Sequence, residues 1–311
     1  MRVAIFGSGG VGGYFGGRLV QSGEEVIFIA RGEHLRVIRE RGLRVDSPEG
    51  DFVVSPAQVS DAPAAVGTVE VILLGVKAWQ VPEAAWAMRP MVGDSTFVVP
   101  LQNGVEAPMH LASVLGNPHV LGGLCHISVY RVRPAYIRHA GIQPHIAFGE
   151  LDNRPSERAE RLRAAFERAG VWAEIPADIH AAMWEKFLFI ASLAGVGAVT
   201  RAPVGAIRYL EVTRKLLVGA MQEVARLAEA KGVHLPAEVI EKTMDYVDTL
   251  PESATTSMQR DIIEGRPSEL ADLNGAVVRL GREVGVDTPI HTFLFYALLL
   301  QEKRARGELT F

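Results

Sequence analysis

The clearest chemical signal in the sequence is a glycine run near its start. The pattern G-x-G-x-x-G is formed by Gly7, Ser8, Gly9, Gly10, Val11 and Gly12. It follows the apolar segment Val3–Phe6 and opens a helical stretch, which is the context in which this pattern binds a dinucleotide. Gly7 permits a tight turn, Gly9 lets a pyrophosphate approach the backbone, and Gly12 lets the helix pack on the strand. The alternative is a glycine turn without a ligand, which the strand–turn–helix context disfavours.

The end of the second expected strand indicates which dinucleotide binds. Val26–Ile29 is followed by Ala30, Arg31 and Gly32, where an NAD-binding chain would carry Asp or Glu for the ribose hydroxyl. A basic Arg31 suits a 2′-phosphate, so we expect NADP(H), although an ordinary surface charge is the alternative. Glu33 lies nearby, and we expect it to begin the next helix.

Composition excludes several other classes of protein. The 311 residues are enough for about two domains, and 48% apolar with 22% charged residues is typical of a soluble globular protein. A net charge of −4 offers no basic field for nucleic acid. The single cysteine, Cys125, allows no intrachain disulfide and fits a reducing compartment. Neither Cys125 with His126 nor the histidine spacing suggests a metal site.

No secretory signal precedes the first strand, and no uninterrupted apolar run reaches the ~18 residues that span a bilayer. We therefore expect a cytoplasmic protein without a membrane partner. The sequence leaves the oligomeric state open, and a homodimer is compatible with it.

The first half of the chain alternates strand and helix signals, which predicts an α/β fold with an N-terminal doubly wound Rossmann sheet. The expected strands are Val3–Phe6, Glu25–Ile29, Val69–Val76 and Thr96–Pro100, with helices at Gly13–Ser22 and Pro82–Met91. Three later segments are expected to complete the sheet, namely Ser128–Val132, Tyr136–His139 and His145–Phe148. A helix at Ser156–Ala169 and a strand at Val171–Ile175 end this part.

After Pro176 the spacing is helical throughout, which predicts an all-helical C-terminal domain. The expected helices are Ala181–Val199, Tyr209–Lys231, Pro236–Tyr246, Ser268–Val284 and Pro289–Gly307. We therefore divide the chain into a Rossmann NADP-binding domain, residues 1–176, and a helical substrate and catalytic domain, residues 177–311.

The order and spacing of several short motifs resemble the ketopantoate reductase family (2-dehydropantoate 2-reductases) over nearly the whole chain. Besides the glycine run, the motifs are Ala30–Gly32, Val76–Gln80, Gln102–Val105, Trp184–Phe187, Thr256–Gln259, Ser268–Glu269 and Asn274–Gly275. The resemblance implies a helical domain of the 6-phosphogluconate dehydrogenase type, NADP(H) as cofactor, a small 2-keto acid as substrate, and an active site between the domains.

The resemblance also assigns roles to individual residues. Arg31 and Lys77 would hold the adenosine 2′-phosphate end, with Gln80 in the same motif among the cofactor-binding residues. Asn103 would lie near the nicotinamide and substrate, and Ser257 would bind the substrate carboxylate. The catalytic residues implied are Lys186, as general acid, and Glu269, near the reacting oxygen.

The residue types agree with these roles to different degrees. Lys186 begins an almost wholly apolar segment, where a buried ammonium must be paired or functional and desolvation lowers its pKa from ~10.4. A Lys that extends to water is the alternative. Lys77 and Asn103 follow buried strands, where α/β sheets bind ligands, although Asn103 with Gly104 also suits a simple turn. Glu269 and Ser257 are equally ordinary helix-start residues.

Three positions depart from the family pattern. Ile190, Ala194 and Val204 stand where the family usually carries Asn. Ile190 and Ala194 are four and eight residues after Lys186, so we expect them on the same helix face, where they offer no amide to a substrate hydroxyl. The leading function is NADPH-dependent reduction of a 2-keto acid, 2-dehydropantoate to (R)-pantoate by resemblance. The alternatives are a reductase for a more apolar keto acid and a non-catalytic NADP(H)-binding or sensing protein.

Overall fold

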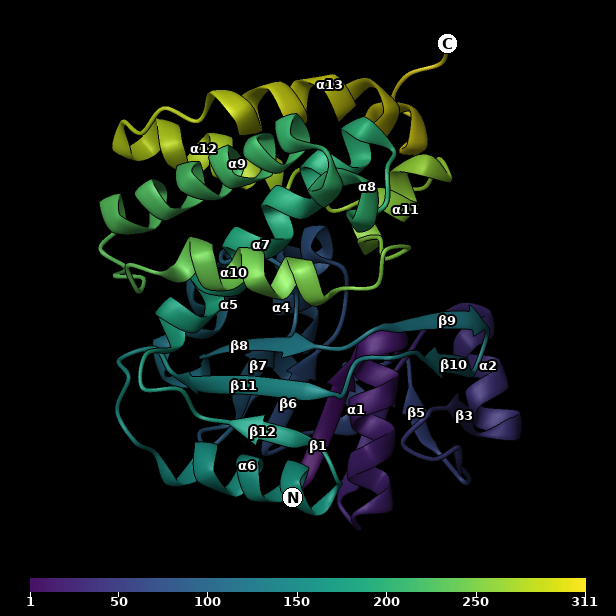
Figure 1. The fold of residues 1–311 in the computed structure, drawn as a ribbon. Coiled ribbons are helices and arrows are strands. Elements are labelled where there is room, and N and C mark those ends of the chain that lie inside the picture. The colour runs from purple at the N-terminus through teal and green to yellow at the C-terminus, as the bar shows by residue number, and fades with distance from the viewer. The chain divides into compact units, whose positions relative to one another are not determined.

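The computed structural model describes all 311 residues, which form two compact units. The Rossmann unit comprises Met1–Gln102 and Glu106–Ile179, and the helical unit comprises Asn103–Val105 and His180–Phe311. The division lies shortly after the expected position at Pro176. The short segment Asn103–Val105 groups with the helices although it follows a strand. Figure 1 labels most of the elements of both units.

A five-stranded parallel sheet forms the centre of the Rossmann unit, in the order β5-β2-β1-β6-β7. Its strands are β1 (Arg2–Phe6), β2 (Glu25–Ile29), β5 (Gln58–Ser60), β6 (Val71–Leu74) and β7 (Phe97–Pro100). The chain places β2 and β5 on one side of β1 and then returns to place β6 on the other side. Because the order reverses between β1 and β6, the carboxyl ends of these strands are where this class of sheet binds ligands.

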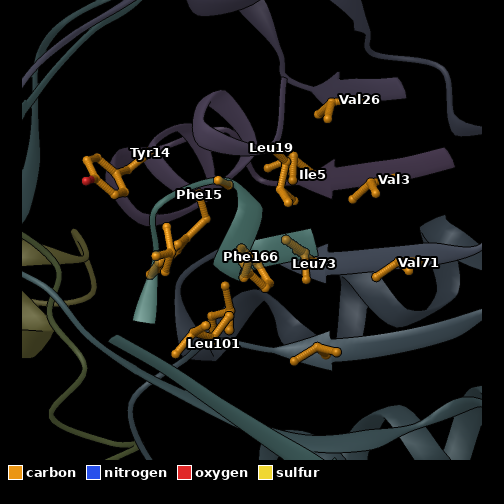
Figure 2. Packing of buried hydrophobic residues seen from close by; sticks show 14 of the residues in the cluster. Val3, Ile5, Tyr14, Phe15, Leu19, Val26, Val71, Leu73, Leu101 and Phe166 are labelled. Atoms are coloured by element: carbon orange, nitrogen blue, oxygen red, sulfur yellow. The ribbon is translucent and has the colours of Figure 1, made fainter. Parts of the chain in front are cut away.

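Both faces of this sheet are buried, as the continuous apolar strands predict. Along β1, Val3 and Ile5 join one hydrophobic cluster, and Ala4 and Phe6 join another. The helices that supply these clusters are α1 (Gly10–Gln21), α2 (Gly32–Arg41) and α6 (Glu157–Arg168) on the first face, and α4 (Val81–Met88) and α5 (Ala107–Leu115) on the second. On the first face, the rings of Phe15 and Phe166 meet edge to face with centroids 5.8 Å apart (Figure 2).

The later strands do not complete the central sheet, so that expectation is wrong. A four-stranded sheet has the order β4-β3-β10-β9, and a three-stranded sheet has the order β12-β11-β8. Their strands are β3 (Leu43–Asp46), β4 (Phe52–Val54), β8 (Leu121–His126), β9 (Val129–Arg133), β10 (Tyr136–His139), β11 (His145–Glu150) and β12 (Trp172–Glu174). Ile137 of β10 lies against Gly13 of α1, so this sheet covers the side of α1 that faces away from the central sheet. Only one bridge, between Val98 and Val120, links β7 to the residues before β8.

Short helices complete the Rossmann unit. They are α3 (Pro63–Val66) and the 3₁₀ turns η1 (Ala78–Gln80), η2 (Arg89–Met91) and η3 (Asn117–His119).

The helical unit contains seven helices around one hydrophobic core. They are α7 (Ile179–Thr200), α8 (Val204–Tyr209), α9 (Glu211–Ala230), α10 (Val239–Thr249), α11 (Ser257–Ile263), α12 (Asn274–Val284) and α13 (Pro289–Ala305). The helix expected over Ser268–Val284 begins only at Asn274, and the residues before it form a turn.

Helix α7 forms the centre of this core. Phe187, Leu188, Ala191 and Ala194 are fully buried along it, which confirms the expectation that this apolar segment lies inside the protein. By length and composition α7 alone could cross a membrane, but 67% of its most apolar window is buried, as in the core helix of a soluble protein.

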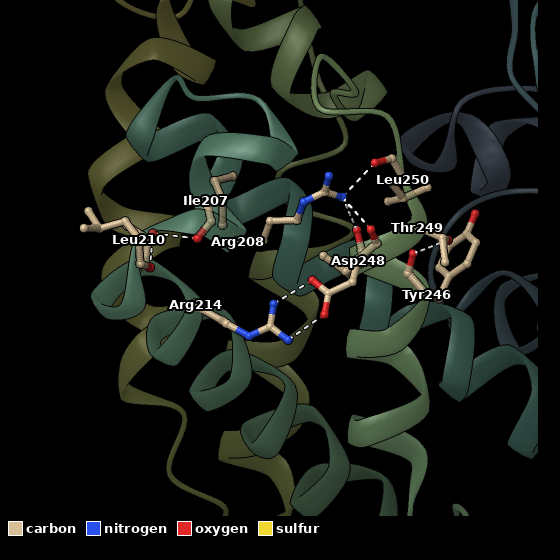
Figure 3. A network of polar contacts seen from close by, with 10 residues as sticks. Ile207, Arg208, Leu210, Arg214, Tyr246, Asp248, Thr249 and Leu250 are labelled. Atoms are coloured by element: carbon tan, nitrogen blue, oxygen red, sulfur yellow. Dashed lines mark hydrogen bonds and ion pairs between the residues drawn. The ribbon is translucent and has the colours of Figure 1, made fainter.

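Two arginines, one on α8 and one on α9, fix the segment that leads from α10 to α11. Arg208 of α8 donates to the backbone carbonyls of Val247, Asp248 and Leu250 at 2.7–2.9 Å, which satisfies the open C-terminus of α10 (Figure 3). Arg214 of α9 binds the Asp248 carboxylate with two hydrogen bonds of 2.6 and 2.7 Å. These contacts fix the point at which the chain leaves α10 towards Ser257.

Candidate active site

The glycine run forms the turn between β1 and α1, where the sequence predicts it. Gly7 has a φ of 99°, a conformation that residues other than glycine rarely adopt. A Cβ on Gly12 would lie 2.2 Å from the Gly7 carbonyl oxygen, so the helix approaches the strand more closely than any side chain allows. Nothing lies within 4 Å of a Cβ built on Gly9. The turn is therefore tight at Gly7 and Gly12 and open at Gly9.

The residues of this turn fit a dinucleotide pyrophosphate. Gly9 is the N-cap of α1 and has no side chain to accept hydrogen bonds from the first N–H groups of the helix. Those donors and the positive end of the helix dipole suit an anion. The sequence assigned Ser8 to the cofactor as well. Ser8 is 2% exposed, and its hydroxyl and its backbone N–H both donate to the Ile29 carbonyl at 3.3 Å, so it links the turn to β2.

The two basic residues expected at the adenosine end follow strands adjacent to β1. Arg31 is the N-cap of α2, directly after β2, and its side chain is 68% exposed in an ion pair with Glu83 at 3.3 Å. Such exposed pairs contribute only about 0–1 kcal/mol, so a phosphate could replace Glu83 at little cost. Glu33 lies in the first turn of α2, as expected, where its carboxylate pairs with Arg36 at 3.8 Å.

Lys77 follows β6, and its ammonium lies 5.6 Å from the centre of the Trp79 ring. Its backbone N–H donates to Oε1 of Gln80 at 3.2 Å, so Gln80 closes the η1 turn in this structure. Sequence reasoning gave no role of its own to Gln102, which is 6% exposed. Its side-chain amide donates to the carbonyls of Leu74 and Val76 at 2.8 and 2.9 Å. Gln102 therefore fixes the loop that carries Lys77.

A buried histidine that sequence reasoning missed fixes the glycine turn. His34 of α2 is 8% exposed, and its Nδ1 accepts a hydrogen bond from the Ala135 backbone N–H at 3.0 Å. Its Nε2 must then carry the proton, which it donates to the Ser8 carbonyl at 2.7 Å. Burial lowers the pKa of His34, the hydrogen bond to Ser8 opposes this, and the charge of Arg131 adds to the lowering. No sequence motif marks His34, because its two partners lie 26 and 101 residues away.

In the helical unit, the structure brings together two of the predicted site residues. The side-chain amide of Asn103 donates to Oε2 of Glu269 at 3.3 Å, across 166 positions of sequence. Glu269 is 5% exposed and lies in the turn before α12, not in the first turn of a helix. The structure therefore excludes the ordinary helix-start explanation for this carboxylate.

Ser257 is the first residue of α11, and the cap is made by its neighbour. Thr256 Oγ1 accepts from the Gln259 N–H at 3.2 Å, and Gln259 Oε1 accepts from the Thr256 N–H at 3.4 Å. The capping explanation for Ser257 is therefore wrong. Ser257 is partly exposed, and its role in binding the substrate stays a prediction.

Lys186 lies near the start of α7 and is partly buried. Of the three positions that replace family Asn residues, Ile190 is partly exposed, whereas Ala194 and Val204 are 0% and 2% exposed in the helical core. The expectation that Ala194 lies beside Lys186 on a helix face open to the substrate is therefore wrong. Helix α7 is packed on most of its circumference, so a shared helix face does not imply shared exposure.

These features define the class of the protein. A Rossmann turn that fits a pyrophosphate, followed in sequence by a helical unit with a partly buried Asn–Glu hydrogen bond, is the arrangement expected of a dinucleotide-dependent oxidoreductase.

Comparison with known proteins agrees with this class. The chain matches the family described as ketopantoate reductase PanE/ApbA over residues 3–153, and its C-terminal domain over residues 178–302. It is 30% identical to 2-dehydropantoate 2-reductase of Mesorhizobium japonicum, over 93% of this chain and 94% of that protein.

Solved structures give the same result. The PanE/ApbA family ketopantoate reductase from Ralstonia eutropha superposes with a TM-score of 0.90 at 32% identity, over 98% of this chain and 100% of the other. 2-dehydropantoate 2-reductase from Geobacter metallireducens superposes with a TM-score of 0.90 at 31% identity, over 96% of this chain and 99% of the other. The chain therefore belongs to the ketopantoate reductase family. It is an NADP(H)-dependent oxidoreductase that acts on CH–OH groups.

We predict that His34 makes the stability of the Rossmann unit depend on pH. The pKa of His34 is lower in the folded protein than in the unfolded chain, where it is about 6.5. The stability that neutral His34 contributes is therefore fully present above pH 6.5 and is lost as the pH falls through the pKa of the folded state. At pH 7.5, His34→Gln should lower the free energy of unfolding by about 1–3 kcal/mol through the loss of buried hydrogen bonds. The difference in the free energy of unfolding between the unmodified protein and the variant should shrink towards pH 5, as measured by denaturant unfolding of the two proteins. A constant difference across this range would contradict the prediction.

Proposed function

We propose that this protein uses NADPH to reduce the carbonyl of a small 2-keto acid in the cytoplasm. Two substrates of this class are supported by different observations: the names of the relatives point to 2-dehydropantoate, which would be reduced to (R)-pantoate in pantothenate biosynthesis, and Ile190 points to a more apolar 2-keto acid. The observation that carries the proposal is the hydrogen bond between the partly buried Asn103 and the buried Glu269. A polar pair of this kind contributes little to folding in comparison with apolar packing, but it can orient a substrate carbonyl.

The residues have separate tasks in this mechanism. Bound NADPH supplies the hydride for the carbonyl carbon. Lys186 donates a proton to the carbonyl oxygen, so that the C=O group gains one hydride and one proton and becomes CH–OH. The amide of Asn103 orients the reacting group, and Glu269 holds that amide through its Oε2 atom. The Ser257 hydroxyl donates to the substrate carboxylate.

The cofactor assignment rests on the Rossmann unit. The backbone N–H groups at the start of α1 would bind the pyrophosphate, and Arg31 with Lys77 would bind the 2′-phosphate. A purely NADP(H)-sensing protein would need these groups but not Lys186, Glu269 and Ser257. Their presence together favours an enzyme.

The first prediction concerns the substrate. Ile190 is partly exposed and offers no amide, so we expect a 2-keto acid without the hydroxyl of 2-dehydropantoate to have the higher kcat/KM. An unpaired hydroxyl costs about 1–3 kcal/mol, so 2-dehydropantoate should still react, but more slowly. The test is NADPH oxidation across a panel of 2-keto acids that includes 2-dehydropantoate and its deoxy analogue.

The matched variant is Ile190→Asn alone, because Asn at the fully buried Ala194 would overpack the core. It should shift the preference towards 2-dehydropantoate. A clear preference of the unmodified enzyme for 2-dehydropantoate would show that other groups bind the hydroxyl. Turnover of no 2-keto acid would refute the proposed function itself.

The second prediction concerns Arg31. Arg31→Ala should weaken NADPH binding by about 1–3 kcal/mol, the range of a charge-assisted hydrogen bond, and leave NADH binding almost unchanged. Arg36→Ala, on the same helix and also exposed, is the control and should affect neither cofactor. Binding titrations decide the matter, and equal losses for NADPH and NADH would refute the role of Arg31.

The third prediction concerns Lys186. Lys186→Ala should lower kcat by about 10²–10⁴-fold, the usual contribution of a positioned general acid, with NADPH binding nearly intact. Lys215→Ala removes an exposed lysine of α9 that pairs with Glu211 one turn earlier, and should turn over normally. Normal turnover of the Lys186 variant would mean that another group donates the proton.

A further inference from the structure

The turn that carries Glu269 is held on both sides by hydrogen bonds. The Glu269 carbonyl accepts from the N–H groups of Asp272 and Leu273 at 3.1 and 2.9 Å. On the other side, the Ser268 hydroxyl accepts from the Leu270 N–H at 3.3 Å, across Glu269 itself. Ser268 is fully buried, so its own polar groups must find partners inside the protein.

Those partners come from the last turn of α13. The Glu302 carboxylate accepts from the Ser268 N–H at 3.1 Å to each oxygen, and from the Ser268 hydroxyl at 2.5 Å. Arg306 donates from Nε to Glu302 at 2.6 Å and from Nη2 to the Ser268 carbonyl at 2.9 Å. Every polar atom of Ser268 is thus bonded, and Glu302 or Arg306 supplies a partner for each.

The location of Glu302 is unfavourable in two respects. It is 4% exposed, and it lies near the C-terminus of α13, where the helix dipole disfavours a negative charge. Arg306 offsets both effects, but an apolar residue would need no such compensation. What the carboxylate contributes is a set of charge-assisted hydrogen bonds, which are shorter and stronger than neutral ones, to the residue that precedes Glu269.

We infer that Glu302 is a positioning residue that acts through Ser268 to hold the Glu269 carboxylate where Asn103 contacts it. The inference rests on the proposed function, since it assigns Glu302 a role in the same reaction. Small displacements of a group that orients the substrate cost a great deal of rate, on the order of 10²-fold for 1 Å. Glu302 itself need not touch the substrate.

The test compares two buried carboxylates that both anchor α13. Glu223 of α9 is 1% exposed and accepts from the N–H groups of Ile290 and His291 at 2.7 and 2.9 Å, at the opposite end of the helix. The two anchoring points are about 18 Å apart along α13, at 1.5 Å per residue. Glu223→Gln therefore perturbs the same helix without touching Ser268.

We expect Glu302→Gln to lower kcat roughly 10²-fold with the KM for NADPH unchanged, because a carboxamide keeps one acceptor oxygen and replaces the other with an NH2 donor, which cannot accept from Ser268 or Arg306. Ser268→Ala, which removes only the hydroxyl, should lower kcat about 10-fold and is measured in any case, so that the inference remains testable if Glu302→Gln does not fold. Glu223→Gln should destabilise the protein but keep the kcat of the folded enzyme.

A double-mutant cycle separates positioning from general structural damage. If Glu302 acts through Glu269, then adding Glu302→Gln to Glu269→Ala should change kcat by less than about 2-fold. Independent effects that multiply would overturn the inference. So would a wild-type kcat in both Glu302→Gln and Ser268→Ala.

Hydrogen exchange provides a readout that does not depend on turnover. The amides of residues 268–273 should exchange faster in Glu302→Gln and at the wild-type rate in Glu223→Gln. Unchanged exchange in Glu302→Gln would overturn the inference even if the enzyme reduces keto acids. If the unmodified protein reduces no keto acid while the exchange result holds, the proposed function fails and Glu302 is left as an anchor of this turn alone.

Discussion

The close approach of α1 to β1 is the constraint on which the Rossmann unit depends. It requires Gly12, because a Cβ there would lie 2.2 Å from the Gly7 carbonyl oxygen. The same approach directs the N-terminus of α1 towards the carboxyl end of β1, where the strand order reverses. The proposed binding site for the pyrophosphate is therefore a consequence of helix-to-strand packing and needs no dedicated side chain.

Contacts from outside the motif then keep the glycine turn in place. His34 binds the Ser8 carbonyl from α2, and Ser8 in turn binds Ile29 at the end of β2. On the other side of β1, a Cβ on Gly75 would lie 2.8 Å from the Gly7 carbonyl oxygen, so the loop after β6 packs directly on the turn. The loops that follow β2 and β6 are thus coupled to the turn, as the proposed binding of one cofactor by basic residues on both loops requires.

The helical unit uses a different device, because it positions side chains by means of buried carboxylates. Glu223 and Glu302 anchor opposite ends of α13, and each accepts backbone N–H groups that no helix or sheet satisfies. Glu269 is a third buried carboxylate, and its partner Asn103 enters from the segment after β7. Buried charges are costly in an apolar core, and their hydrogen bonds are directional. The helical unit accepts that cost at the turn that carries the proposed site.

The sequence by itself determined the alternation of buried strands and helices, the glycine turn, the basic residue after β2 and the burial of α7. These features depend on local periodicity and on the residues next to each other in the chain. The tertiary structure decided the rest. It showed that Asn103 groups with the helices, that Ala194 is buried, that Thr256 and not Ser257 caps α11, and that the later strands form separate sheets. It also identified His34, Gln102 and Glu302. Each of these side chains bonds to a backbone group at least 26 residues away. Because every residue type carries a peptide C=O, and all but proline carry an N–H, the amino-acid type of the partner does not reveal such a contact.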